Sequence, residues 1–185
     1  MQLTVTETPI KGLIIIETKI FEDERGFFME SYSKRDFTNA GITDEFVQEN
    51  HSRSGKGVIR GLHYQNMSAP MAKLVRCTHG RVFDVAVDIR TSSATFGQWF
   101  GIELSSENKN MFYVPVGFAH GFQTLTDEAE LQYKQTNYYN PYAEGTILWN
   151  DEDIKIKWPL TEQILSNKDK LGVTLRQYRE NPVFS

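Results

Sequence analysis

The chain has 185 residues, of which 39% are hydrophobic and 24% charged, a composition that excludes a disordered or membrane-embedded protein. Its formal net charge of −4 argues against a nucleic-acid partner, because binding to phosphate backbones usually needs a basic surface. Cys77 is the only cysteine, the N-terminus lacks signal-peptide features, and the apolar run at 13–16 is too short to span a bilayer. We therefore expect a cytoplasmic protein with no membrane partner.

Strand signals dominate the chain, in short segments punctuated by Gly, Pro and Asn. In chain order, strands are expected at residues 13–18, 58–65, 73–78, 81–89, 97–104, 110–114, 121–125, 130–138 and 154–158. A helix interrupts them after Ser33, which has capping-box spacing to Asp36, and it stops at Gly41. Residues 78–80 predict a tight hairpin. This pattern favours a mainly β, antiparallel barrel or jelly roll with short peripheral helices. No linker or repeat divides the chain, so we expect one domain over residues 1–185.

Period-two alternation sorts two of these strands into faces. In residues 81–89, the face that carries Asp84 and Asp88 should meet a more polar region than the apolar face opposite. Leu131 and Tyr133 should point together. In residues 60–65, Arg60 falls on the opposite face from His63 by strict alternation. If both serve one site, the glycine between them must allow a bulge or bend.

One motif of the chain is typical of metal-binding proteins. Residues 115–120, PVGFAH, match the second half-motif of the cupin superfamily, whose barrels often hold a metal. The usual first half has a His-x-His pair, whereas His63 is followed two residues later by Gln65. One histidine from each half is too few ligands for a tight site. The sequence therefore predicts a cupin-like barrel with no catalytic metal.

His63, Lys73 and Tyr133 together suit proton transfer beside a carbonyl group. Histidine is the usual general base near neutral pH, particularly when a carboxylate fixes its tautomer. A lysine ammonium or a second histidine can stabilise an enolate oxygen, and a tyrosine hydroxyl can supply a proton. This chemistry requires no cofactor. His51 and His79 are expected to be surface or turn residues.

Several segments, in order along nearly the whole chain, resemble the dTDP-4-dehydrorhamnose 3,5-epimerase family. They are residues 23–30, 46–52, 60–65, 73–76, 83–88, 117–122, 149–151 and 165–169. The resemblance implies a cupin-like jelly roll that is metal-independent and homodimeric. It also implies a nucleotide-sugar substrate, dTDP-4-dehydro-6-deoxy-D-glucose, inverted at carbons 3 and 5 to dTDP-4-dehydro-L-rhamnose. In one departure, Met71 and Ala72 precede the lysine where family members usually carry Gln-Gly.

The resemblance also implies roles for individual residues. His63 is expected to be the base, with Asp169 as its orienting partner in a dyad. Lys73 is expected to stabilise the enolate oxygen, and Tyr133 to be the acid on the opposite face of the ring.

Further residues match substrate-contacting positions of the family. His120 is expected to line the sugar pocket and Arg60 to contact the diphosphate. Arg25 is expected to reach the diphosphate from the N-terminal arm of a partner subunit. The remaining matched positions are Glu30, Gln48, Asn50, Glu144, Lys168 and, near the nucleotide, Phe28.

Other interpretations stay open from the residues alone. Asp169 stands at capping-box spacing from Ser166, so its role could be structural. Asp84 is a rival partner for His63, Tyr133 could be a core aromatic, and Arg25 could belong to turn chemistry. The alternative functions are a mono-epimerase acting on a related sugar, a non-catalytic nucleotide-sugar binder and a metal-dependent oxygenase or isomerase.

Overall fold

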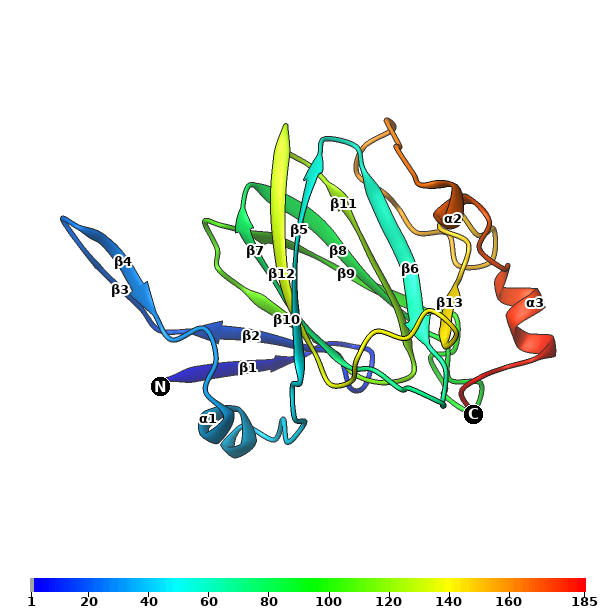
Figure 1. Cartoon of the computed structure of the whole chain (residues 1–185), viewed down its shortest axis with the longest axis horizontal. Coiled ribbons are helices and arrows are strands. Elements are labelled where there is room, and N and C mark those ends of the chain that lie inside the picture. Colours follow the sequence, from blue (N-terminus) through cyan, green and yellow to red (C-terminus); the bar gives the residue numbers. More distant parts are fainter. Residues whose placement is uncertain (1) are drawn as a thin grey trace.

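Two facing antiparallel sheets form the body of the protein in the computed structural model, which describes residues 2–185 (Figure 1). In spatial order, the first sheet contains β1 (Leu3–Glu7), β2 (Ile14–Thr18), β10 (Met111–Val114), β7 (Lys73–His79), β12 (Glu128–Gln135) and β5 (Gln48–Gly55). The second sheet contains β13 (Glu144–Thr146), β6 (Ile59–Gln65), β11 (Phe118–Thr124), β8 (Arg81–Asp88) and β9 (Trp99–Ser105). The expected mainly β, jelly-roll class is confirmed.

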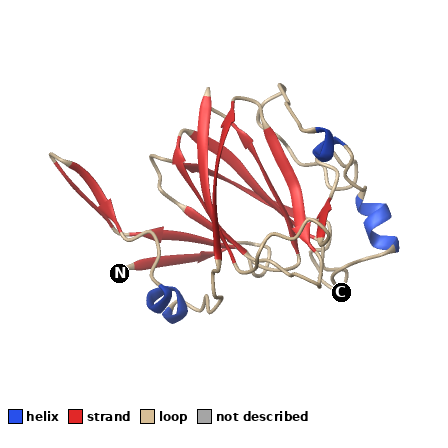
Figure 2. Cartoon of the chain, viewed as in Figure 1, coloured by secondary structure: helices blue, strands red, loops and turns tan. Residues whose placement is uncertain are grey.

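Short helices decorate both ends of the chain, as expected (Figure 2). They are α1 (Lys34–Asn39), α2 (Asn167–Lys170) and α3 (Leu175–Glu180). Ser33 is the N-cap residue of α1, although its side chain makes no capping hydrogen bond, and Gly41 follows the helix with a φ of 90°. Within residues 2–185, no helix is long and apolar enough to cross a membrane.

Apolar side chains bury both faces of the second sheet. The cluster between the two sheets joins residues of β7, β8, β11 and β12, among them Val75, Ala86, Phe122 and Leu131. A second cluster lies behind β6 and β8 and is covered by α3 through Leu175 and Tyr178. The side of β8 that carries Asp84 therefore faces the barrel interior. Asp84 and Asp88 are both fully buried, so the expected polar region lies inside the protein.

Eight of the nine expected strands overlap strands of the structure, whereas β1, β5, β13, β3 (Ile20–Asp23) and β4 (Gly26–Met29) were not expected. The strand expected at 154–158 is wrong, because the Asp151 carboxylate accepts the amides of Asp153 and Ile154 and folds this segment into a turn. β11 begins at Phe118 and not at the expected residue 121, so His120 lies within the strand. The sequence interpretation missed β5, whose eight residues QENHSRSG include no large apolar side chain.

The turn at Gly80 does not close a hairpin as expected. β7 pairs with β10 and β12, whereas β8 pairs with β9 and β11, so the turn carries the chain from one sheet to the other. Gly80 has a φ of 67°, which suits a tight crossing. As a result, Lys73 and Asp84 reach the barrel interior from opposite sheets.

A separate hairpin of β3 (Ile20–Asp23) and β4 (Gly26–Met29) projects from the body (Figure 1). Its side chains Phe21, Phe27 and Phe28 are each more than half exposed, at 52%, 57% and 64%. Arg25 lies at the tip and is paired with Asp23. We call residues 20–29 the arm.

Candidate active site

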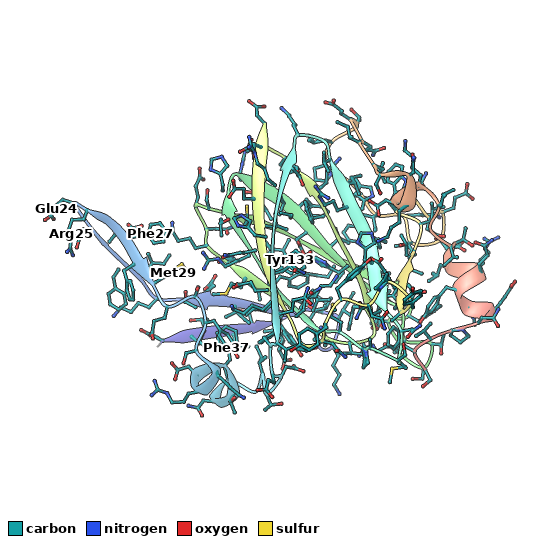
Figure 3. The ribbon with its side chains drawn as sticks, viewed as in Figure 1. Glu24, Arg25, Phe27, Met29, Phe37 and Tyr133 are labelled. Atoms are coloured by element: carbon teal, nitrogen blue, oxygen red, sulfur yellow. The ribbon has the colours of Figure 1, made fainter. Side chains whose placement is uncertain are left out.

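Two adjoining cavities of about 260 and 280 Å³ are lined by strands of both sheets. They share six lining residues, His63, Lys73, His120, Tyr133, Tyr139 and Glu144. The first cavity extends to Gln48 and Asn50, and the second extends to Arg60 and Lys168. Figure 3 shows Tyr133 inside the barrel, where it packs against the cluster between the sheets. Most of the expected site residues therefore meet in one place.

A bulge at Gly61 brings Arg60 and His63 to the same cavity. Opposite β11, His63 pairs with His120 but Arg60 pairs with Phe122, so the register shifts between them. Gly61 has a φ of 138°, and a Cβ there would lie 2.5 Å from the Cα of Gly121. Only glycine fits so close an approach between two backbones. The expected bend is confirmed.

His63 and Asp169 form a hydrogen-bonded pair, with Nε2 of the ring 2.6 Å from Oδ1 of the carboxylate. Burial tends to raise the pKa of Asp169, but hydrogen bonds from His63 and Ser166 and the charge of Lys168 together lower it. An ionised carboxylate only accepts, so Nε2 of His63 carries the hydrogen and Nδ1 keeps its lone pair. Ser166 also caps α2 by accepting from the Asp169 amide. The capping interpretation and the dyad contact therefore both hold.

Asp84 bonds to the second histidine of the cavity. Nε2 of His120 lies 2.8 Å from its Oδ1, and both side chains are buried. The sequence-based rival pairing of Asp84 with His63 is therefore wrong. Burial lowers the pKa of His120, against the opposing effect of Asp84, and so favours the neutral ring.

Lys73 opens β7 and lines both cavities. Burial lowers its pKa to about 8, although the carboxylates of Asp84 and Glu144 oppose the shift. The ammonium is therefore largely charged at neutral pH but close to its titration point. Ala72, the unusual neighbour, is 1% exposed, and its amide donates to Thr136, which holds the start of β7 against β12.

A chain of side-chain amides lines the first cavity. Gln48 donates to Asn50, Asn50 donates to Gln135, and Gln135 donates to the sulfur of Met71. Gln48 and Asn50 were expected, whereas Gln135 and Met71 were not. The last two bonds span 85 and 64 residues and connect β5, β12 and the segment before β7, so no local pattern could reveal them.

Glu144 links two further groups at the cavity wall. It pairs with Lys168 and accepts a hydrogen bond of 2.9 Å from the hydroxyl of Tyr139. Burial tends to raise the pKa of Glu144, but these two contacts lower it overall. Tyr139 was missed by the sequence interpretation. Arg60, at the other side of the second cavity, is held by Ser54 through its Nε.

Three expected residues lie away from this site. Arg25 and Phe28 belong to the arm, and Glu30 follows it as an exposed residue. Figure 3 shows Arg25 at the tip of the arm, well separated from Tyr133. Within one chain, none of the three lines either cavity. Over residues 2–185, no group of three or more His, Cys, Asp or Glu side chains is arranged to hold a metal ion.

Comparisons with known proteins identify the family of the chain. Residues 7–177 match the family model of dTDP-4-dehydrorhamnose 3,5-epimerase. The Shigella flexneri enzyme of that name is 55% identical, over 92% of this chain and 94% of its own.

Solved structures of similar sequence have the same fold. The Legionella pneumophila epimerase, in complex with dTDP-4-keto-L-rhamnose, has a TM-score of 0.91 and 51% identity, covering 95% of this chain and 94% of that one. ChmJ, a 3'-monoepimerase from Streptomyces bikiniensis in complex with dTDP-quinovose, has a TM-score of 0.90 and 31% identity, covering 96% and 90%. The chain belongs to the dTDP-4-dehydrorhamnose 3,5-epimerase family.

Proposed function

We propose that the chain inverts carbons 3 and 5 of dTDP-4-dehydro-6-deoxy-D-glucose to give dTDP-4-dehydro-L-rhamnose. The observation that carries this proposal is the placement of His63 on one sheet and of Lys73 and Tyr133 on the facing sheet, around shared cavities. A sugar ring between them meets a base on one face and an acid on the other. The names of relatives that are more than half identical support the same reaction.

The reaction follows from the position of the ketone. Carbons 3 and 5 both flank carbon 4, so the same carbonyl acidifies both protons. Nδ1 of His63 removes a proton, and the Asp169 carboxylate stabilises the resulting imidazolium. The negative charge moves to the ketone oxygen, where the Lys73 ammonium stabilises it.

Reprotonation completes each inversion. The Tyr133 hydroxyl, or a water molecule, returns a proton to the opposite face of the ring. His63 then releases the proton it took to solvent and Tyr133 regains one from solvent, so the same steps at the other carbon complete the double inversion. One proton leaves and one arrives at each carbon, so the reaction needs no cofactor.

The charged residues of the second cavity suit the diphosphate. Arg60 and Lys168 line the same cavity, and arginine and lysine are the usual partners of phosphate oxygens. His120, Gln48, Asn50 and Glu144 present polar groups to the sugar-nucleotide. We place the sugar ring where the two cavities overlap.

We further infer that the protein is a homodimer in which the arm of one subunit completes the site of the other. Exposed aromatic rings on a projecting hairpin favour a partner, and Arg25, Phe28 and Glu30 are the residues it would supply. The buried free thiol of Cys77 suits a reducing compartment, so we assign the protein to the cytoplasm.

Incubation with the nucleotide sugar in heavy water tests the reaction. Deuterium is expected at carbons 3 and 5, located by NMR, and at neither carbon with His63→Ala. Labelling at one carbon alone would assign the chain to the mono-epimerases, the activity named for ChmJ. Binding of the nucleotide sugar without any exchange would make it a non-catalytic binder.

A further inference from the structure

The loop of residues 137–143 closes one side of both cavities and is fixed by side chains. Tyr139 lines both cavities. The amides of Tyr138, Tyr139 and Asn140 donate to the side chains of Asn137, Gln48 and Gln65, respectively. Tyr138 and Tyr142 are 67% and 95% exposed, so little apolar packing holds the loop. Its position therefore depends on a few hydrogen bonds.

Gln65 supplies two of the bonds that reach the loop from outside, more than any other single side chain. The others come from Gln48, Glu144 and the backbone of Asn66 and Pro70. Its Oε1 accepts from the amide of Asn140 at 2.7 Å, and its Nε2 donates to the carbonyl of Tyr138 at 3.2 Å. Nε2 also donates to the carbonyl of Ala69 at 2.8 Å. The side chain is 5% exposed and thus hydrogen-bonds to the backbone of the residues before and after Tyr139. It stands two residues after His63, where a metal-binding cupin motif would place its second histidine.

A double inversion requires that the sugar stay bound between two proton transfers. In the first transfer a C–H bond breaks to His63, and a new C–H bond forms with a proton from the acid. The product of that step is a complete 4-keto sugar that can leave as a singly inverted compound. Most walls of the cavities are strands of the two sheets. The loop of residues 137–143, which we call the Tyr139 loop, is instead held by side chains. The loop is therefore the wall whose opening releases this intermediate.

We propose that Gln65 is a positioning residue that keeps the Tyr139 loop closed over the singly inverted intermediate until the second inversion is complete. The proposal rests on the proposed function. Gln65 lines the first cavity, but both ends of its amide are bonded to backbone groups, so it acts through the loop and does not exchange protons with the sugar. It determines how much singly inverted product escapes.

The test measures the ratio of singly to doubly inverted nucleotide sugar at low conversion, by NMR of the sugar ring. Gln65→Met removes all three hydrogen bonds, and Gln65→Glu keeps the side-chain size and the acceptor for Asn140 but loses both donations. The singly inverted fraction should rise roughly ten-fold in each, because a net loss of one to two hydrogen bonds shifts the closing equilibrium by that order. If Gln65→Met does not fold, Gln65→Glu alone decides the question.

Gln123 provides a matched control on the neighbouring strand β11. Its buried amide holds a different loop through the same kind of bonds. Nε2 donates to the carbonyls of Leu160 and Glu162, and Oε1 accepts a hydrogen bond from the amide of Leu160. Gln123 lines neither cavity. Gln123→Met should therefore lower the melting temperature and leave the product ratio unchanged.

Two outcomes would overturn the proposal. One is an unchanged product ratio in a folded Gln65 variant, and the other is an equal rise in Gln123→Met, which would indicate general loosening of the barrel. Failure of the proposed function looks different, because the wild-type protein would then not exchange deuterium at both carbons.

Discussion

His63 and His120 are paired directly across strands β6 and β11, yet each ring bonds to a different carboxylate. His63 bonds to Asp169 from α2, and His120 bonds to Asp84 from β8. Directly paired residues of neighbouring strands point to the same side of the sheet, so both rings face the cavities. The two carboxylates should therefore have separable effects on catalysis.

Asp169→Asn should lower kcat by about a hundred-fold or more while the protein stays folded, because general-base catalysis contributes at least that much. An amide at position 169 can donate to Nε2 of His63, which would move the ring hydrogen to Nδ1 and remove the basic lone pair. Steady-state kinetics with circular dichroism measure the effect. Asp153→Asn, which breaks an exposed ion pair with Arg176, is the control. Near-normal kcat in Asp169→Asn would exclude the dyad.

The fall of kcat/KM at alkaline pH, which is the alkaline limb of the pH profile, should reflect the deprotonation of Lys73. Its pKa is lowered to about 8, so the ammonium proposed to stabilise the enolate is lost as pH rises through that value, and kcat/KM should fall. Lys73→Arg keeps the charge at higher pH and should remove this limb, at some loss of rate from the larger side chain. Asp84→Asn should move the limb to lower pH, because the Asp84 carboxylate favours the charged lysine. A limb that stays in place in both variants would exclude Lys73 as its source.

Gly61→Ala should destabilise the fold and lower activity together. The added Cβ would lie 2.5 Å from Gly121 and 2.9 Å from the carbonyl of His120, and the φ of 138° is unfavourable for alanine. The cost should be about 2 kcal/mol or more in the free energy of unfolding, measured by urea titration. Gly41→Ala is the control, because Gly41 also has positive φ but no atom within 4 Å of the added group. Equal costs at both positions would mean that the close approach to Gly121 is unimportant.

The sequence predicted features that have a local cause. Alternating apolar residues located strands such as β8 and β12, and the mismatch between Arg60 and His63 located the bend at Gly61. β5 lacks that alternation, because Gln48 and Asn50 face the cavity while outward residues such as Glu49 form ion pairs with β12. A strand that is polar on both faces gives no hydrophobic signal.

The contacts that organise the site depend on residues far apart in the sequence. The bond between His63 and Asp169 spans 106 residues, and its expectation came from family resemblance. The hydrogen bond between Gln65 and Asn140 spans 75 residues, and neither a local pattern nor the family resemblance predicted it. Asp84 was considered as a rival partner of His63, and its bond to His120 was not expected, because alternation gives the face of a strand but not the partner opposite.

The position of the arm leads to a test by subunit complementation. In an arm-exchanged dimer, His63→Ala and Arg25→Ala subunits each lack one half of a complete site. Mixing the two inactive variants under conditions of subunit exchange should restore roughly a quarter of wild-type activity, because about half the dimers are mixed and each has one intact site. Mixing His63→Ala with Asp169→Asn is the control. Both substitutions lie in the body of the subunit, so every site of a mixed dimer keeps one of them and no arm can replace the lost group. Only the residual activity of Asp169→Asn should remain. Absence of recovery in the first mixture, with mixed dimers demonstrated by mass spectrometry, would show that Arg25 does not act across the interface.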